Sequence, residues 1–158
     1  MRYSIITTPI GPLMLTGDDQ ALTGLHLPNR HCPAAGLTRD DERFAPEARQ
    51  LEQYFEGTRT TFEIPLRLEG GEFERRVWDE LLNIPYGTTD SYGALARRLG
   101  APGSARAVGA ANGRNPIAIV VPCHRVIGAN GTLTGYGGGL ECKRTLLDLE
   151  AGIVPLAA

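Results

Sequence analysis

The residues best suited to chemistry are Cys123, His124 and Arg125, which follow one another directly after Pro122. A free cysteine thiol has a pKa of about 8.5, so only a few per cent of it is nucleophilic thiolate at neutral pH. An adjacent base and nearby cations lower that pKa, and His124 and Arg125 provide both in the sequence. The segment therefore predicts a cysteine nucleophile with a histidine partner.

The surroundings of Cys123 predict a buried position. Residues 117–121 are an apolar run too short for an isolated helix, and we expect a buried extended segment that ends at Pro122. Cys123 should then lie at the bottom of a pocket. Neighbours in sequence need not touch, however. The residues alone leave a second interpretation open with equal weight, a buried structural cysteine beside a surface histidine.

The elements that must position this segment are helices. Apolar residues recur at helical spacing before Pro85. Either Asp90 or Ser91 is the candidate N-cap of the next helix, and Ser104 is the candidate for a further one. Two helices joined by a short turn that contains glycine form the helix-turn-helix pattern. We expect helices over 73–82, 91–99, 104–112 and 140–150, with a glycine-rich loop over 128–139.

The first part of the chain has the pattern of a small sheet. We expect strands over 2–7, 13–16 and 21–27, an irregular segment over 28–43, a helix over 46–56, and a possible return to the sheet at 62–64. The fold class is therefore α+β. A small N-terminal α/β domain (1–70), with a short antiparallel sheet plus a helix, packs on a C-terminal mainly helical domain (71–158) with the helix-turn-helix.

The charge distribution points to an anionic partner although the net charge is −2. No Asp or Glu occurs between Ser91 and Leu140, while five arginines do: Arg97, Arg98, Arg106, Arg114 and Arg125. Such a stretch is the electrostatic footprint expected for an anion. The alternative is a solvated basic face, and charge alone does not decide between them.

Composition excludes several other classes. Three cysteines make no disulfide framework and favour a reducing compartment, so we expect a cytoplasmic protein. No apolar run approaches the roughly 20 residues that span a bilayer, and the first residues do not resemble a secretory signal. His26, His31 and Cys32 lie on a loop-like stretch without zinc-ligand spacing, so no metal is expected.

Several segments together resemble one family, the O6-alkylguanine-DNA alkyltransferases, also called methylated-DNA–protein-cysteine methyltransferases. The central match is Pro122-Cys123-His124-Arg125-Val126. The resemblance covers about 73–152 and is looser before it. The other matching segments are Val77-Trp78, Ile84-Pro85-Tyr86-Gly87, Ser91-Tyr92-Gly93, Ala105-Arg106-Ala107-Val108-Gly109, Asn115-Pro116, Gly135-Tyr136 and Glu150.

The resemblance implies a role for each catalytic residue. Cys123 is the alkyl acceptor, His124 is the general base acting through a water, and Glu150 orients that histidine. Tyr136 donates a hydrogen bond to the guanine ring as negative charge develops on it. Asn115 is a structural hinge before the active-site segment. This is the nucleophile, base and orienting-group arrangement of a catalytic triad applied to another reaction.

The resemblance also implies how DNA is bound. Arg106 enters the duplex where the flipped nucleotide was, and Tyr92 crowds the phosphate. The small residues Ala105 and Ala107 allow the helix to approach the minor groove closely. Arg125 is also expected to contact DNA. A base inside a duplex must be extruded before its O6 substituent can be attacked, at a cost of a few kcal/mol.

The activity implied is direct reversal of DNA damage by a suicidal methyltransferase. The alkyl group of O6-alkylguanine, and also the methyl of O4-methylthymine, moves from duplex DNA to Cys123 in one irreversible turnover, without a cofactor. We expect a monomer in solution that can assemble cooperatively on DNA, with no membrane partner. Gly137 departs from the serine of some relatives, which bears on the acceptance of bulky O6 groups.

Three rival functions remain in view. A lesion-sensing module of the same fold lacks the acceptor cysteine, whereas this chain has Cys123. A thiol hydrolase or acyltransferase is compatible with Cys-His and a glycine-rich loop but leaves Arg106 unexplained. A sequence-specific regulator needs more side chains that recognise base edges than the helix over 104–112 carries.

Overall fold

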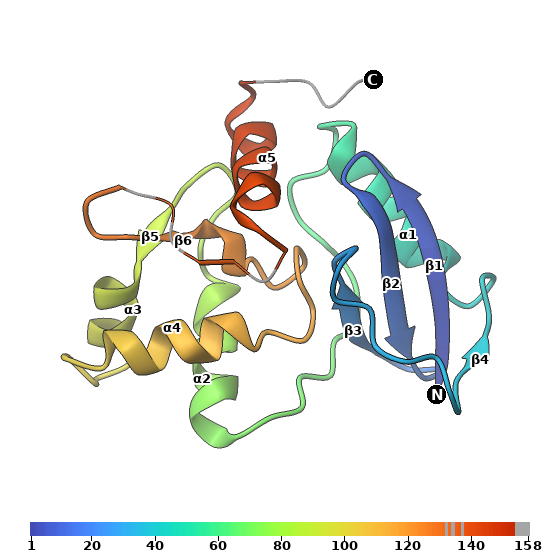
Figure 1. The fold of residues 1–158 in the computed structure, drawn as a ribbon, viewed down its shortest axis with the longest axis horizontal. Helices are drawn as coiled ribbons and strands as arrows, with labels where there is room; N and C mark the ends of the chain where they lie inside the picture. The colour runs from blue at the N-terminus through green and yellow to red at the C-terminus, as the bar shows by residue number, and fades with distance from the viewer. Residues whose placement is uncertain (132, 134, 137, 154–158) are drawn as a thin grey trace.

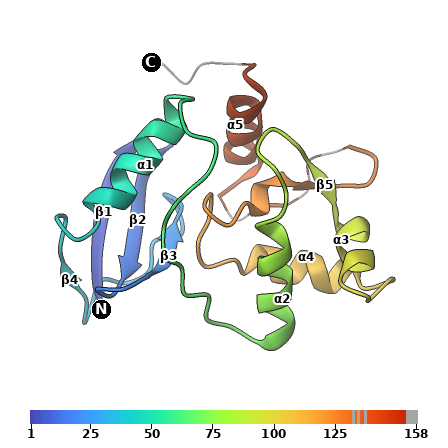
Figure 2. The same ribbon diagram turned by 180° about the vertical axis from the view of Figure 1, so that it is seen from behind.

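The computed structural model describes residues 1–131, 133, 135–136 and 138–153. Its N-terminal part is a four-stranded sheet in the order β3-β2-β1-β4. β1 (Arg2–Thr8), β2 (Gly11–Gly17) and β3 (Leu22–His26) are antiparallel neighbours, and the short β4 (Thr38–Arg39) runs parallel to β1. α1 (Ala45–Phe55) lies across one face of this sheet, as Figure 2 shows.

Two details of the sheet differ from the sequence-based expectation. Residues 62–64 do not return to it; the chain pairs slightly later, where Leu22 donates to the Pro65 carbonyl (2.9 Å) and accepts from the Arg67 amide (3.0 Å). β4 lies in the segment expected to be irregular, because two polar residues are too short a run to show a strand period.

The C-terminal part is mainly helical. α2 and α3 each pack against α4, and Figure 1 shows α5 rising between this group and the N-terminal sheet. Two very short strands, β5 and β6, pair with each other in parallel. The elements are α2 (Glu72–Leu81), β5 (Asp90–Ser91), α3 (Tyr92–Arg98), α4 (Ala105–Gly113), the 3-10 turn η1 (Cys123–Arg125), β6 (Val126–Ile127) and α5 (Leu140–Ala151).

The helix-turn-helix is formed by α3 and α4. The Ser91 hydroxyl accepts the amide of Ala94 (3.1 Å), so of the two candidates, Asp90 and Ser91, it is Ser91 that caps α3. Ser104 precedes α4, but its side chain makes no capping hydrogen bond, which corrects that expectation. Between the helices Gly100 has φ +73°, a conformation that a side chain disfavours, and the chain turns there.

The two parts are joined by backbone hydrogen bonds and by one continuous apolar core. The Leu25 amide of β3 donates to the Pro116 carbonyl (3.0 Å), and the Ala118 amide donates to the Leu25 carbonyl (3.2 Å). The core runs from Phe44 in the N-terminal part to Trp78 in α2. The α+β fold expected from the sequence, with an N-terminal sheet part and a mainly helical C-terminal part that contains the helix-turn-helix, is confirmed.

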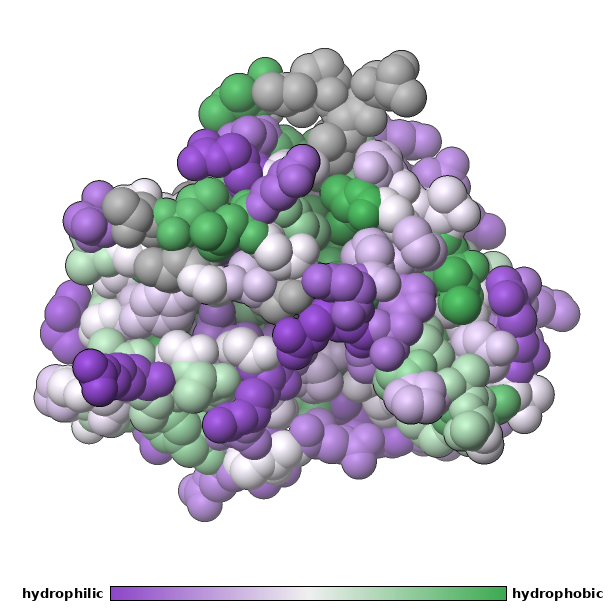
Figure 3. Space-filling model, in the orientation of Figure 1, coloured by the Kyte–Doolittle hydropathy of each residue, from purple (hydrophilic) through white to green (hydrophobic). Residues whose placement is uncertain are grey.

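The surface in Figure 3 mixes hydrophilic and hydrophobic side chains over the face shown. Among the described residues, no helix combines the length and the apolar character that a membrane crossing requires.

Candidate active site

The segment before the cysteine is buried but turned, not extended as expected. Val121 donates to the Ile117 carbonyl (3.0 Å), and Val120 donates to the Ala118 carbonyl (2.8 Å). Ile119 is 1 % exposed and has φ +72°, a left-handed conformation that costs a β-branched residue about 1–2 kcal/mol. The apolar packing around this residue holds the turn, and apolar character alone does not distinguish such a turn from a strand.

Asn115 fixes this turn from both sides. Its Nδ2 donates to the Val121 carbonyl (2.7 Å), and its Oδ1 accepts the Ile117 amide (3.0 Å). The two bonds span the beginning and the end of the buried turn. The side chain therefore sets the path of the chain into Cys123, which supports the hinge role implied by the resemblance.

Cys123 is the first residue of η1 and is 5 % exposed. Its amide donates to the Val121 carbonyl (2.8 Å) across Pro122, and its carbonyl accepts from Asn112 Nδ2 (3.2 Å). It lies in a pocket of about 250 Å³ to which both parts of the chain contribute. Other residues lining the pocket include Asn115 and Tyr136 and, from the N-terminal part, His26, Leu27 and Arg30.

Glu150, on α5, is the centre of a buried polar cluster. Its Oε2 lies 2.7 Å from His124 Nε2, 2.7 Å from the Tyr54 hydroxyl and 3.0 Å from Arg125 Nη2. Its Oε1 accepts from Arg125 Nε (2.7 Å), and Arg125 Nη1 donates to the Ile84 carbonyl (2.7 Å). The bonds from His124 and Arg125 bring the pKa of Glu150 down to about 2 despite burial, so the carboxylate is charged.

The charge on Glu150 determines the tautomer of His124. A carboxylate oxygen accepts only, so the nitrogen 2.7 Å away, Nε2, must carry hydrogen. Burial lowers the pKa of His124, so the ring is neutral and Nδ1 keeps its lone pair. Nδ1 is buried and has no hydrogen-bond partner among the described residues. The ring is therefore set up to accept one proton at Nδ1.

The pKa of Cys123 differs from the expectation. Burial raises it, which outweighs the opposite effects of Asn115, Tyr136 and Lys143. Arg125 does not serve the thiol, because its guanidinium is engaged with Glu150. The resting side chain is therefore a neutral thiol, and the proton must be removed as the sulfur reacts.

Tyr136 contributes a buried hydroxyl to the same pocket. The oxygen has no hydrogen-bond partner among the described residues. Burial and the nearby Cys123 raise the pKa of this phenol well above its ordinary value, so it is a neutral donor. Gly137, the departure from the serine of some relatives, lies outside the described residues.

The residues expected to bind DNA separate into two groups. Arg106 and Ala107 are exposed on α4, and Ala105 is half-buried beside them. Tyr92 is half-buried at the start of α3, where a side chain on Gly109 would approach its ring to 3.7 Å. Arg125, by contrast, is 7 % exposed and bonded to Glu150, so its expected contact with DNA does not agree with the structure.

In the folded structure, several arginines of the acid-free stretch are paired with acidic residues, so the stretch is less basic than its sequence suggests. Arg98 pairs with Glu80 (2.8 Å) and Asp90 (2.7 Å), and Arg114 pairs with Glu74 (3.1 Å). These acids come from outside the stretch. With Arg125 bonded to Glu150, Arg97 and Arg106 are the arginines of this stretch for which the described residues provide no partner. Arg106 therefore stands out as an available cation on α4, the second helix of the helix-turn-helix.

Two residues of the site were not found by sequence reasoning. Tyr54, from α1, donates to Glu150, and nothing near it in sequence signals that contact. Lys143, the only lysine of the chain, is fully buried on α5, and its Nζ donates to the Val126 carbonyl (2.6 Å). The spacing of Lys143, Leu146 and Glu150 places charges on the buried face of α5, a signal that could have been noticed.

No metal site is evident among the described residues, since no group of three potential ligands lies together there. His31 instead contacts the Pro12 carbonyl (3.0 Å), and Cys32 lies 3.9 Å from the Met14 sulfur.

Comparison with known proteins identifies the family of the chain. Residues 72–152 match the DNA-binding domain of 6-O-methylguanine DNA methyltransferase, and residues 1–68 match the ribonuclease-like domain of the same family. The methylated-DNA–protein-cysteine methyltransferase of Mycolicibacterium paratuberculosis is 55% identical over 152 residues, which are 95% of this chain and 92% of that protein. The protein of the same name from Methanosarcina acetivorans is 49% identical over 153 residues, which are 95% of this chain and 98% of that protein.

A solved relative has the same architecture. The crystal structure of Mycobacterium tuberculosis OGT in complex with DNA superposes with a TM-score of 0.94 at 52% identity, over 98% of this chain and 96% of that one. These matches span nearly the whole chain, and Cys123, the residue expected to accept the alkyl group, lies within them. The chain therefore belongs to the 6-O-methylguanine DNA methyltransferase family, enzymes that repair DNA by transferring an alkyl group to a cysteine of their own.

Proposed function

We propose that the protein removes the alkyl group from O6-alkylguanine, and the methyl group from O4-methylthymine, in duplex DNA, and keeps it on Cys123. The observation that carries this proposal is the pocket around Cys123. Its volume of about 250 Å³ suits a single base and not a stretch of duplex. The damaged nucleotide must therefore be rotated out of the stack through the minor groove to reach the sulfur.

Arg106 and Tyr92 would assist that rotation. Arg106 is exposed on α4 with neighbours as small as Ala105 and Ala107, so the helix can lie close to the DNA backbone while the arginine fills the gap left by the base. Tyr92, half-buried at the start of α3, would press on the adjacent phosphate. The protein would bind as a monomer and assemble cooperatively on DNA.

Transfer would begin with the thiol proton. His124 Nδ1 accepts it through one bridging water, and Glu150 stabilises the imidazolium that forms. The Cys123 sulfur then attacks the alkyl carbon as the bond from that carbon to guanine O6 breaks. The electron pair passes to the guanine ring, where the Tyr136 hydroxyl donates a hydrogen bond to the developing charge.

The product is a thioether on Cys123. To release the alkyl group, the Cys123 thiolate would have to leave an unactivated carbon. None of the proposed steps brings this about, so each molecule acts once. The alkyl donor is the lesion itself, and no cofactor enters the reaction. In this proposal residues 71–158 carry DNA binding and transfer, while residues 1–70 form the domain that packs on them.

The experiment is to incubate the protein with a duplex that carries one O6-methylguanine and to weigh the intact protein. A gain of a single methyl group, mapped to Cys123 and stopping at one per molecule, is expected. Tight binding of the damaged duplex without any gain of mass would overturn the proposal in favour of lesion sensing.

A further inference from the structure

We propose that Tyr54, on the N-terminal helix α1, is a positioning residue for alkyl transfer, because its hydroxyl fixes the carboxylate that orients His124. The inference rests on the proposed role of His124 as general base. It gives the N-terminal part of the chain a direct place in the chemistry, in addition to its packing against the C-terminal part.

The tyrosine is held so that its hydroxyl has one direction. The side chain is fully buried, and its ring meets Phe55 (5.2 Å between centroids) and Tyr86 (6.2 Å) edge to face and packs at 5.5 Å from Phe62. The hydroxyl donates to Glu150 Oε2 at 2.7 Å. Burial and the carboxylate raise the pKa of this phenol far above its ordinary value, so it stays a neutral donor at every relevant pH.

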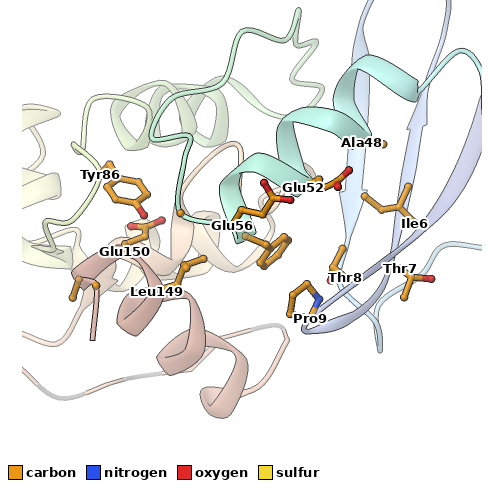
Figure 4. A pocket seen from close by; sticks show the side chains of 14 residues that line it. Ile6, Thr7, Thr8, Pro9, Ala48, Glu52, Glu56, Tyr86, Leu149 and Glu150 are labelled. Carbon is orange, nitrogen blue, oxygen red and sulfur yellow. The ribbon is translucent and has the colours of Figure 1, made fainter. Parts of the chain in front are cut away.

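The bond joins α1 to α5 beside a large groove. Figure 4 shows this groove, of about 1200 Å³, with Glu150 and Tyr86 on one wall and Glu52 and Glu56 of α1 on another. Although the groove opens beside it, the Glu150 side chain is only 1 % exposed, because neighbouring side chains, Tyr54 among them, enclose its carboxylate. The Tyr54 hydroxyl supplies a fixed contact on that side.

The contact also sets how strongly Glu150 holds the proton on His124. Oε2 shares its negative charge among His124, Arg125 and Tyr54. Removing the hydroxyl leaves more charge for the histidine, which stabilises imidazolium and raises the pKa of His124. The cations facing the pair, Arg125 and Lys143, act in the opposite direction and are unchanged by that removal.

The test compares Tyr54→Phe with Tyr86→Phe. The first change keeps the ring and removes only the hydroxyl bonded to Glu150. The matched control removes a neighbouring hydroxyl for which the described residues show no hydrogen bond to Glu150. His124 is titrated by NMR in each folded protein, which is practical because the chain has three histidines. We expect the His124 pKa to rise by about one unit in Tyr54→Phe and to stay at the wild-type value in Tyr86→Phe.

The transfer rate to an O6-methylguanine duplex provides the second measurement. When the transfer rate is plotted against pH, its fall on the acid side should move to higher pH in Tyr54→Phe. Well below the midpoint of that fall, the rate should be about tenfold lower than in the wild type. In a Glu150→Gln background the same hydroxyl should have almost no effect. Equal losses with and without the Glu150 carboxylate, or unshifted His124 titrations, would show that Tyr54 only packs.

The two hypotheses fail in different ways. Suppose that the wild-type protein accepts a methyl group, and that Tyr54→Phe shows the same pH profile and the same His124 titration as the wild type. The Tyr54 inference is then overturned, and the proposed function stands. If the wild-type protein accepts no methyl group, the proposed function is overturned. The NMR titration then decides the positioning role by itself, since it requires no turnover.

Discussion

His124 Nε2 lies 2.7 Å from Glu150 Oε2, although the two residues belong to different elements, η1 and α5. The pair is buried. Folding itself brings the two elements together, so the cost of ordering the base is met on folding. A buried, charged carboxylate has consequences for stability as well as for chemistry.

The first prediction concerns the pH dependence of stability. Glu150 has a pKa of about 2 in the folded protein and an ordinary value of 4.5. Its contribution is therefore fully present above pH 4.5 and is lost as the pH falls through 2. Over that window the free energy of unfolding should drop by about 3 kcal/mol because of this group. Urea denaturation at a series of pH values measures the drop.

Glu150→Gln is the informative variant for this prediction. It should be less stable at pH 7 by about 3–5 kcal/mol, because Arg125 stays buried without its counter-charge, and its acid slope should be shallower. Glu141→Gln, at an exposed position of the same helix, should keep the wild-type slope. Parallel acid slopes in all three proteins would contradict the assigned role of Glu150.

The second prediction separates chemistry from binding. Cys123→Ser removes the thiol and should abolish transfer, while damaged duplex still binds with nearly wild-type affinity, because the sulfur lies at the pocket floor and not on the exposed face of α4. Gel-shift titration and intact-protein mass spectrometry measure the two effects. Cys142→Ser, a half-buried thiol on α5, is the control and should still accept one methyl group. Methyl transfer by Cys123→Ser would place the acceptor elsewhere.

Sequence patterns predicted the helices and strands better than the conformation of the segments that connect them. Helical periodicity and the Ser91 cap located α2 and α3, because those signals are local. The turn at Ile119 was missed because its conformation is imposed by Asn115 and by the surrounding core, not by its own preference. Composition cannot show such a constraint.

Contacts between residues distant in sequence were the other feature that the sequence patterns did not predict. Arg125 was expected to contact DNA and was counted among the arginines of the acid-free stretch, yet folding brings Glu150 from 25 residues away to bind it. Tyr54 reaches the same carboxylate from 96 residues away. The order of charged residues along the chain does not show which of them form ion pairs in the folded protein. The acid-free stretch therefore predicted a more basic surface than the structure has.

The third prediction concerns Arg106 on α4, the second helix of the helix-turn-helix. Arg106→Ala should weaken duplex binding and slow transfer from duplex DNA more than transfer from free O6-methylguanine base, since only the duplex requires extrusion of the nucleotide. Binding should also lose about one unit of its log–log salt slope if the arginine contacts a phosphate. Arg49→Ala, exposed on α1, should leave both reactions unchanged. Equal slowing on duplex and free base would count against a role in flipping.

The fourth prediction concerns Lys143, the buried lysine near the nucleophile. Its positive charge lowers the pKa of Cys123 against the larger effect of burial. Lys143→Met keeps the length of the side chain and removes the charge, so the pKa of Cys123 should rise further. If the rise is about one unit, alkylation of Cys123 by iodoacetamide should slow about tenfold at neutral pH, because the thiolate fraction falls by that factor.

The variant also separates charge from packing. The Val126 carbonyl loses its donor, which should cost about 1–3 kcal/mol of stability, whereas the exposed neighbour Arg144→Gln should change neither stability nor alkylation. The rate of alkylation is followed from low to high pH. If charge is what matters, the Lys143→Met curve moves to higher pH and reaches the wild-type rate at its plateau. A curve that is lowered at every pH without moving would mean that Lys143 acts only by holding β6 against α5.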